Sequence, residues 1–303
     1  MILEPPAKSQ TELFANAAVA RSQTRYVELA NGETPYWVYP ATKPSRGTIL
    51  FVHGYRGTRQ GVEPTVGALE NYDCIVPELP GFGEAPPLQI EHSIENYADW
   101  LDSFVSAVKP EGDLSIFGHS FGTIVIGRYV TKFGKDNRLI LMNPVSMPAM
   151  KGPRTILTKV SKVWYKIAAN IPERAGRWML GHPLVIWLVT EFLFKGNDPV
   201  LKGWIHAQHK RYFSTFANTR MVEEAFTASC EHNLTEYADS INQPVLLLCA
   251  DQDDITSIEA QREAAKLYAN ATYVEMLGVG HLPHYERVEV VAKHTDEFIT
   301  LNR

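Results

Sequence analysis

Residues 114–122 read Leu-Ser-Ile-Phe-Gly-His-Ser-Phe-Gly, and the segment Thr-Ile-Val-Ile follows them at 123–126. The apolar residues before the first glycine predict a strand, and the apolar run after Gly122 predicts a helix. Gly118 and Gly122 permit a sharp turn because larger side chains would keep the strand and the helix apart. Such a turn holds Ser120 in a strained backbone conformation, with its hydroxyl at the top of a sheet. We therefore predict that Ser120 is a nucleophile.

Short β-rich runs recur along the rest of the chain, and helix-like patterns separate most of them. The runs are 48–52, 74–76, 114–117, 138–142, 245–249 and 271–276. Two further runs, 26–29 and 35–39, flank Asn31-Gly32, which is typical of a hairpin turn. Strands that alternate with helices predict an α/β fold, with a mostly parallel central sheet flanked by helices on both faces. Ligands of such sheets bind at the carboxyl ends of the strands.

The alternation breaks between residues 145 and 238, where we find only helix-like stretches punctuated by proline and glycine. We interpret residues 145–238 as a helical cap inserted into the core. The core then consists of residues 23–144 and 239–303, and residues 1–22 are expected to form a loosely held N-terminal arm. Four of the six tryptophans fall in the cap segment: Trp164, Trp178, Trp187 and Trp204.

Composition limits the class of protein. The chain has 303 residues, of which 45% are hydrophobic and 21% charged, so it can bury a sizeable core. The net charge of -5 argues against a nucleic-acid-binding protein, which would carry a basic surface. The three cysteines form neither a CxxC pair nor an even disulfide framework. No secretory signal is visible, and the longest apolar stretch is too short for a membrane span, so we expect a cytoplasmic protein.

A serine nucleophile needs hydrogen-bond donors for the oxyanion that forms when it attacks a carbonyl group. One donor is expected to be the backbone N–H of Phe121, the residue after the serine. The second is expected to be the N–H of Tyr55, because an apolar strand at 49–52 ends in His53-Gly54. His53 could itself be a catalytic base. We interpret it instead as a structural histidine that bonds this loop.

The base is expected late in the chain, where His281 follows a glycine just past the run 271–276. His284 is the competing candidate and is expected to be peripheral, because Pro283 and a helix adjoin it. The acid is expected after the run 245–249, where three aspartates lie close together. We favour Asp253 and leave Asp254 and Asp251 as alternatives. Asn143, at the other position open to an acid, cannot supply the charge.

These motifs give the chain, over roughly residues 25–300, a pattern that resembles the capped α/β-hydrolase family. The resemblance is carried by Val52-His53-Gly54-Tyr55, Leu79-Pro80-Gly81-Phe82-Gly83, Gly118-His119-Ser120-Phe121-Gly122, Ala250-Asp251-Gln252-Asp253 and Gly280-His281. In that family the acid usually ends a Gly-x-x-Asp stretch. Here Ala250 replaces the glycine and Asp253 takes the acid position. The resemblance implies esterase, lipase, thioesterase, lactonase or carbon–carbon bond hydrolase chemistry, and it makes dehalogenase or epoxide hydrolase chemistry unlikely, since those enzymes use an aspartate nucleophile.

We accordingly expect a carboxylesterase- or lipase-like hydrolase that works through an acyl-enzyme, without a metal or organic cofactor. Its partner is expected to be a small-molecule substrate with an apolar acyl or alcohol group, recognised by the cap, unless the cap's aromatic residues only pack its own core. An acyltransferase, a lyase or a slowly turning-over ligand receptor with the same triad are the alternatives.

A basic stretch at 151–166 could contact an anionic membrane or attract an anionic substrate, although a solvated face is the simpler interpretation. Its residues are Lys151, Arg154, Lys159, Lys162 and Lys166.

Overall fold

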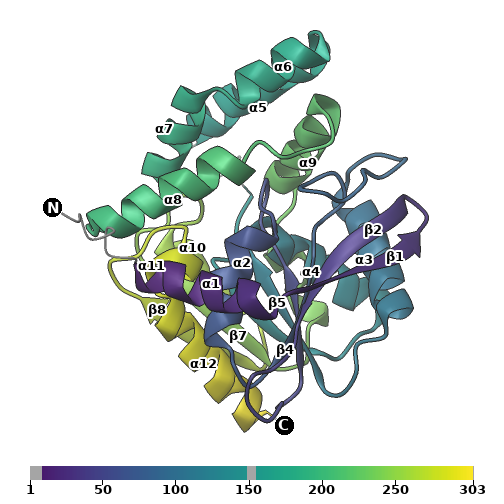
Figure 1. Ribbon diagram of the computed structural model, residues 1–303, viewed down its shortest axis with the longest axis vertical. Coiled ribbons are helices and arrows are strands. Elements are labelled where there is room, and N and C mark those ends of the chain that lie inside the picture. Colours follow the sequence, from purple (N-terminus) through teal and green to yellow (C-terminus); the bar gives the residue numbers. More distant parts are fainter. Residues whose placement is uncertain (1–8, 149–154, 303) are drawn as a thin grey trace, which may run out of the picture.

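The computed structural model describes residues 9–148 and 155–302. An eight-stranded sheet of order β1-β2-β4-β3-β5-β6-β7-β8 crosses the molecule (Figure 1). Strand β2 is antiparallel to both of its neighbours, β1 and β4, and all other pairs are parallel. The predicted α/β fold is therefore confirmed. The strands are β1 (Gln23–Leu29), β2 (Gly32–Tyr39), β3 (Thr48–Val52), β4 (Asp73–Pro77), β5 (Leu114–His119), β6 (Arg138–Met142), β7 (Val245–Ala250) and β8 (Ala271–Met276).

Helices cover both faces of the sheet, and each face has its own apolar core. One face packs against α3 (Ile94–Val108), α4 (Phe121–Phe133) and α10 (Ile258–Ala265). The other packs against α1 (Gln10–Arg21), α2 (Arg59–Ala68) and α12 (Val288–Leu301). These two cores explain why the central strands read as continuous apolar runs.

Strand β3 shows how one sequence feeds both cores. All five of its residues are buried, and successive side chains point to opposite faces of the sheet. Leu50 and Val52 join the core under α3 and α4, whereas Ile49 and Phe51 join the core under α2 and α12. Fully burying each such side chain contributes about 1.5–3 kcal/mol. The strand is thereby fixed in register, with its carboxyl end at His53.

The hairpin of β1 and β2 forms with a small shift from its predicted position. Leu29 pairs with Gly32, so the two-residue loop is Ala30-Asn31 rather than Asn31-Gly32. The Asn31 side chain donates a hydrogen bond to the Pro86 carbonyl, 2.9 Å away, and is therefore held inside the loop. Gly32 supplies the positive φ of 114° at the first residue of β2.

The N-terminal segment differs from the expected loose arm, because residues 10–21 form α1, packed against α2. A Cβ at Gly67 of α2 would lie 1.9 Å from the Phe14 carbonyl oxygen, so only glycine permits this approach of the two helices. Arg21 donates to the Val66 carbonyl at 2.6 Å, and the Thr11 hydroxyl donates to the Tyr285 carbonyl at 2.7 Å. Large apolar side chains contribute little to this packing, since Leu13 and Val19 are exposed and the buried apolar residues of α1 are Ala15 and Ala18. Polar bonds and a close backbone approach hold the helix instead, and an apolar pattern does not reveal these.

Helices α5–α9 and a short 3-10 helix connect β6 to β7, and the described residues between these strands contain no strand. The helices are α5 (Thr155–Asn170), α6 (Glu173–Leu180), α7 (Pro183–Leu193), α8 (Pro199–Tyr212), α9 (Thr219–Glu231) and η1 (Leu234–Ser240). Figure 1 shows α5 to α8 together at one end of the molecule. None of the helices in the described part of the chain combines the length and apolar character needed to cross a bilayer.

Candidate active site

The turn that presents Ser120 lies between β5 and α4 and is strained. Ser120 has φ 51° and ψ -119°, a combination that L-residues rarely adopt. A Cβ at Gly118 would lie 2.5 Å from Ile126 Cδ1, and one at Gly122 would lie 2.4 Å from the Val52 carbonyl oxygen. Gly122 is therefore required for the helix to approach the end of β3, whereas a side chain at Gly118 would require the Ile126 side chain to move. The turn predicted from the sequence is present with the geometry of a nucleophile elbow.

Ser120, His281 and Asp253 come together in one hydrogen-bonded chain. The distance from His281 Nε2 to Ser120 Oγ is 2.9 Å. On the other side of the ring, His281 Nδ1 lies 2.9 Å and 3.0 Å from the two carboxylate oxygens of Asp253. All three residues are buried. With the Nδ1 proton donated to the carboxylate, Nε2 is left as the acceptor for the serine hydroxyl.

The three aspartates after β7 have separate contacts. Asp251 Oδ1 accepts a hydrogen bond from the Val279 amide at 3.2 Å. Asp254 pairs with Lys195 at 2.7 Å. Asp253 Oδ1 additionally accepts from the Ile255 amide at 2.7 Å, which fixes the rotation of the carboxylate. Of the three carboxylates, Asp253 is the one that contacts the histidine.

His53 bonds its own loop and does not contact Ser120. Its Nδ1 donates to the Gly54 carbonyl at 2.8 Å, and its Nε2 accepts from the Leu79 amide at 2.9 Å. Burial lowers the pKa of His53 to about 4, so the ring is neutral at pH 7. The structural interpretation of this residue therefore agrees with its contacts.

The two predicted oxyanion donors lie on either side of Ser120. Phe121 is the first residue of α4, and a Cβ at Gly54 would lie 3.4 Å from Ser120 Cβ, so the loop that carries Tyr55 adjoins the serine. In the described part of the chain, neither the Tyr55 amide nor the Phe121 amide donates a hydrogen bond to another protein group. Both donors are thus available to a bound oxyanion.

Two further histidines pack behind His281. His119 Nε2 donates to the His281 carbonyl at 3.0 Å, and the His284 ring lies 4.5 Å from the His119 ring. Burial holds the pKa of both His119 and His284 well below the usual range, so both are neutral. The expectation that His284 is peripheral is wrong, because α11 (Pro283–Glu286) turns it inward. The sequence does not reveal the burial of His284, because it depends on how α11 packs beside His119 in the folded chain.

Two glutamates, the buried Glu78 and the partly buried Glu286, brace the loops of the site, and their role was not recognised in the sequence. Glu78 accepts hydrogen bonds from the Arg59 amide at 3.1 Å and the Glu84 amide at 2.6 Å. Glu286 accepts from the Gly280 amide at 3.1 Å, directly before His281. Burial raises the pKa of each carboxyl to about 7. The position of Glu78 directly before Leu79-Pro80-Gly81 could have singled it out, because the family that the chain resembles usually has an aspartate there.

A cavity of about 620 Å³ opens over Ser120 and His281. Its walls come from the core and from the segment between β6 and β7, and they are mostly apolar. The apolar lining includes Val145, Leu157, Tyr165, Leu188, Phe192 and Phe226. The volume and lining suit an apolar group of an organic substrate.

The tryptophans between residues 145 and 238 neither line this cavity nor form a core of their own. Trp164, Trp178 and Trp187 are exposed. Trp204 packs edge-on against Tyr285, with ring centroids 5.4 Å apart. The apolar lining of the cavity therefore comes from other aromatic and aliphatic residues of this segment, not from its tryptophans.

Arg56 joins the loop that carries Tyr55 to the inserted helices, and the sequence did not single it out. Its Nε donates to the Phe213 carbonyl at 3.0 Å, and its Nη2 donates to the Leu180 carbonyl at 3.2 Å. The guanidinium also stacks over the Phe213 ring, 4.1 Å from the centroid. Arg56 is buried and has a positive φ of 53°. This contact spans the boundary between the core and the inserted segment.

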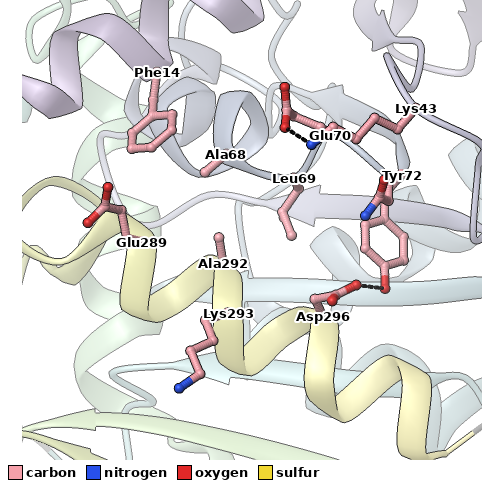
Figure 2. Close-up of a pocket in the computed structure, with 11 residues that line it drawn as sticks. Phe14, Lys43, Ala68, Leu69, Glu70, Tyr72, Glu289, Ala292, Lys293 and Asp296 are labelled. Atoms are coloured by element: carbon pink, nitrogen blue, oxygen red, sulfur yellow. Dashed lines mark hydrogen bonds and ion pairs between the residues drawn. The ribbon is translucent and has the colours of Figure 1, made fainter.

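A second, smaller hollow of about 280 Å³ lies between α2 and α12 and shares no lining residue with the first (Figure 2). Most of its charged side chains pair with neighbours. Lys43 pairs with Glu70 at 2.6 Å, and the Tyr72 hydroxyl donates to Asp296 at 2.8 Å. It contains no cysteine, serine or histidine. Nor, among residues 9–148 and 155–302, do His, Cys, Asp or Glu side chains group to hold a metal ion.

Comparisons with known proteins agree with the α/β fold described above. Residues 49–294 match the model of the alpha/beta hydrolase family. The chain is 23% identical over 269 residues to Lipase 1 of Psychrobacter immobilis, covering 82% of this chain and 76% of that protein. Among solved structures, an esterase from Exiguobacterium antarcticum is similar, with a TM-score of 0.73, 15% identity, and coverage of 92% of this chain and 100% of that one. The enol-lactonase from Burkholderia xenovorans LB400 has a TM-score of 0.73 and 18% identity, with coverage of 91% and 100%. Both structures share the fold.

Proposed function

The chain belongs to the α/β-hydrolase family, and on that premise we propose that it is a carboxylesterase- or lipase-like hydrolase with Ser120 as its nucleophile. The observation that carries this proposal is the 2.9 Å contact between Ser120 Oγ and His281 Nε2 at the floor of the cavity. The related lipases support ester hydrolysis as the reaction.

The proposed reaction passes through an acyl-enzyme. His281 Nε2 takes the hydroxyl proton as Ser120 Oγ attacks the carbonyl carbon of the ester. The amides of Tyr55 and Phe121 hold the oxyanion. When the tetrahedral intermediate collapses, the bond to the leaving oxygen breaks and His281 returns its proton to that alkoxide.

A water molecule then completes the cycle. It loses a proton to His281 and attacks the acyl carbon, and the proton passes to Ser120 Oγ as the carboxylic acid leaves. Asp253 stays ionised throughout and stabilises the imidazolium that forms twice. The neutral rings of His53, His119 and His284 add no positive charge beside His281.

We propose that residues 145–238, which contain helices α5–α9, act as a cap that selects the substrate. Support comes from the cavity, which is lined by Ser120 and His281 from the core and by Leu157 and Leu188 from α5 and α7. Its lining favours an ester with a bulky apolar acyl or alcohol group.

A panel of p-nitrophenyl esters of rising chain length, combined with a fluorophosphonate label, tests this function. We expect hydrolysis of several esters and labelling of Ser120 alone. The Ser120→Ala variant should lose both, since triad enzymes without their nucleophile retain only about a millionth of their kcat. Wild-type hydrolysis by Ser120→Ala would refute the proposal. Labelling of Ser120 without ester turnover would instead favour a transferase, a lyase or a receptor-like protein.

A further inference from the structure

The outer surface of α5, α6 and α7 exposes large apolar side chains that neither a core nor the cavity uses. We call these residues the apolar face: Ile156, Val160, Val163, Trp164, Ile167, Trp178, Leu184 and Trp187. Ile156 is 80% exposed and Trp178 is 69% exposed. Monomeric soluble proteins rarely expose so many large apolar side chains on adjoining helices, and such a patch marks an interaction site.

The α5 part of the apolar face is a single stripe. At 3.6 residues per turn, its members from Ile156 to Ile167 fall within an arc of about 100°. Tyr165, on the opposite side of the helix, lines the cavity and stacks on Phe226 at 4.4 Å. Helix α5 therefore turns one side toward the active site and leaves an unpartnered apolar side outward.

The apolar face is continuous with the mouth of the cavity. Leu157 and Leu188 lie on the same helices as the face, and each is about half exposed while it also lines the cavity. A surface that covers the apolar face would thus lie against the opening through which an apolar substrate reaches Ser120.

Positive charge borders the apolar face. Lys159 and Lys166 are exposed along one edge of the α5 stripe, and Arg174 is exposed on α6. The α5 sequence contains no aspartate or glutamate. Lys162 of the same helix pairs with Glu231 at 2.9 Å, whereas none of the ion pairs between described residues involves Lys159 or Lys166. Lys151 and Arg154, which the sequence also pointed to, lie outside the described residues.

We propose that the apolar face docks onto an anionic lipid surface. Tryptophan and aliphatic side chains would enter the interfacial region, and the lysines would contact the headgroups, as in helices that lie in a membrane interface. A second copy of the chain fits less well, because a two-fold pairing of this face would bring its lysines toward one another. The proposal concerns binding, so it does not depend on the proposed ester hydrolysis.

Vesicle cosedimentation tests the proposal on the full chain, with phosphatidylcholine vesicles that do or do not contain phosphatidylglycerol. We expect the wild type to bind the anionic vesicles, and salt to weaken this binding. Val160→Asp with Val163→Asp should weaken it at least tenfold. Lys159→Glu with Lys166→Glu should weaken vesicle binding by about twenty-five-fold or more, because each lost basic charge accounts for about fivefold.

Matched controls keep the test specific. Val19→Asp changes another exposed helical valine, and Lys293→Glu changes another exposed helical lysine, both outside the apolar face. Both controls should bind as the wild type does, and all variants should hydrolyse a short soluble ester at the wild-type rate. Equal binding by controls and face variants, or no binding by the wild type, would overturn the proposal. So would a stable dimer in light scattering that Val163→Asp dissociates, because the face would then be covered by a second copy.

Discussion

Replacing Asp253 with asparagine should trap His281 in the wrong tautomer. The Ile255 amide donates to Asp253 Oδ1 at 2.7 Å, so the single carbonyl oxygen of an asparagine is drawn to that position. The amide nitrogen must then occupy the place of Oδ2, 2.9 Å from His281 Nδ1. Because that nitrogen can only donate, Nδ1 becomes an acceptor and the imidazole proton moves to Nε2. Nε2 then faces Ser120 as a donor and cannot take its proton.

The expected loss follows from this change of tautomer. A triad whose acid becomes an amide loses about 10⁴-fold in kcat, which corresponds to about 5.5 kcal/mol of transition-state stabilisation. The assay is kcat for a short p-nitrophenyl ester, with thermal unfolding to verify the fold. Asp254→Asn is the matched control. It changes a carboxylate that pairs with Lys195 and lines the cavity, but it leaves the contact between Asp253 and His281 in place, and we expect kcat within about threefold of the wild type. A kcat for Asp253→Asn within tenfold of the wild type, in a folded protein, would refute the reasoning.

Three further predictions concern stability and reactivity. The folded-state pKa of Glu78 is raised to about 7, whereas the unfolded chain releases this proton near pH 4.3. Between these values the native state binds one more proton than the unfolded chain, so the free energy of unfolding should fall as pH rises through 7. Urea unfolding between pH 5 and 8 should show this slope, and Glu78→Gln should reduce it; an unchanged slope would argue against the shift. Gly122→Ala should lower the free energy of unfolding by more than about 3 kcal/mol, because its Cβ would lie 2.4 Å from the Val52 carbonyl oxygen. Gly203→Ala in α8, where no atom lies within 4 Å of the new Cβ, should raise it by about 0.5–1 kcal/mol. Cys74 and Cys249 are buried away from the cavity and burial raises the pKa of both thiols, so a thiol reagent at pH 8 should modify them only after denaturation, whereas Cys230 lines the cavity; fast modification of Cys74 or Cys249 in the native protein, read by mass spectrometry, would contradict this.

The sequence was sufficient for those parts of the site that depend on local backbone chemistry. The glycines around Ser120 indicate the turn, and at Gly122 a larger residue would collide with the backbone at Val52 and His53. The order of strands and the residues that follow them placed His281 and the aspartates at the same sheet edge. The sequence favoured Asp253 but left Asp254 and Asp251 open as alternatives, because all three aspartates follow the same strand. Their contacts differ only in the folded chain.

Features made by distant segments could not be predicted. Arg56 looks like one more polar loop residue until the carbonyls of Leu180 and Phe213 are brought to it. His284 is buried because α11 folds back beside His119. The exposure of the tryptophans could not be predicted for a related reason. Residue type indicates that a side chain is apolar, but not whether the folded chain buries it.

Arg56 also constrains how this protein can be redesigned. Its guanidinium holds two main-chain carbonyls of the inserted segment, at Leu180 and Phe213, and no side chain of that segment is needed for those two bonds. Most side chains of α5 to α8 can therefore be exchanged while the loop that carries Tyr55 keeps its anchor. An insertion or deletion that displaces either carbonyl would instead deprive a buried cation of an acceptor, next to Tyr55. For the hydrolase proposed above, point substitutions in these helices are therefore expected to alter substrate preference, whereas changes of their length near Leu180 or Phe213 are expected to disturb the proposed oxyanion loop.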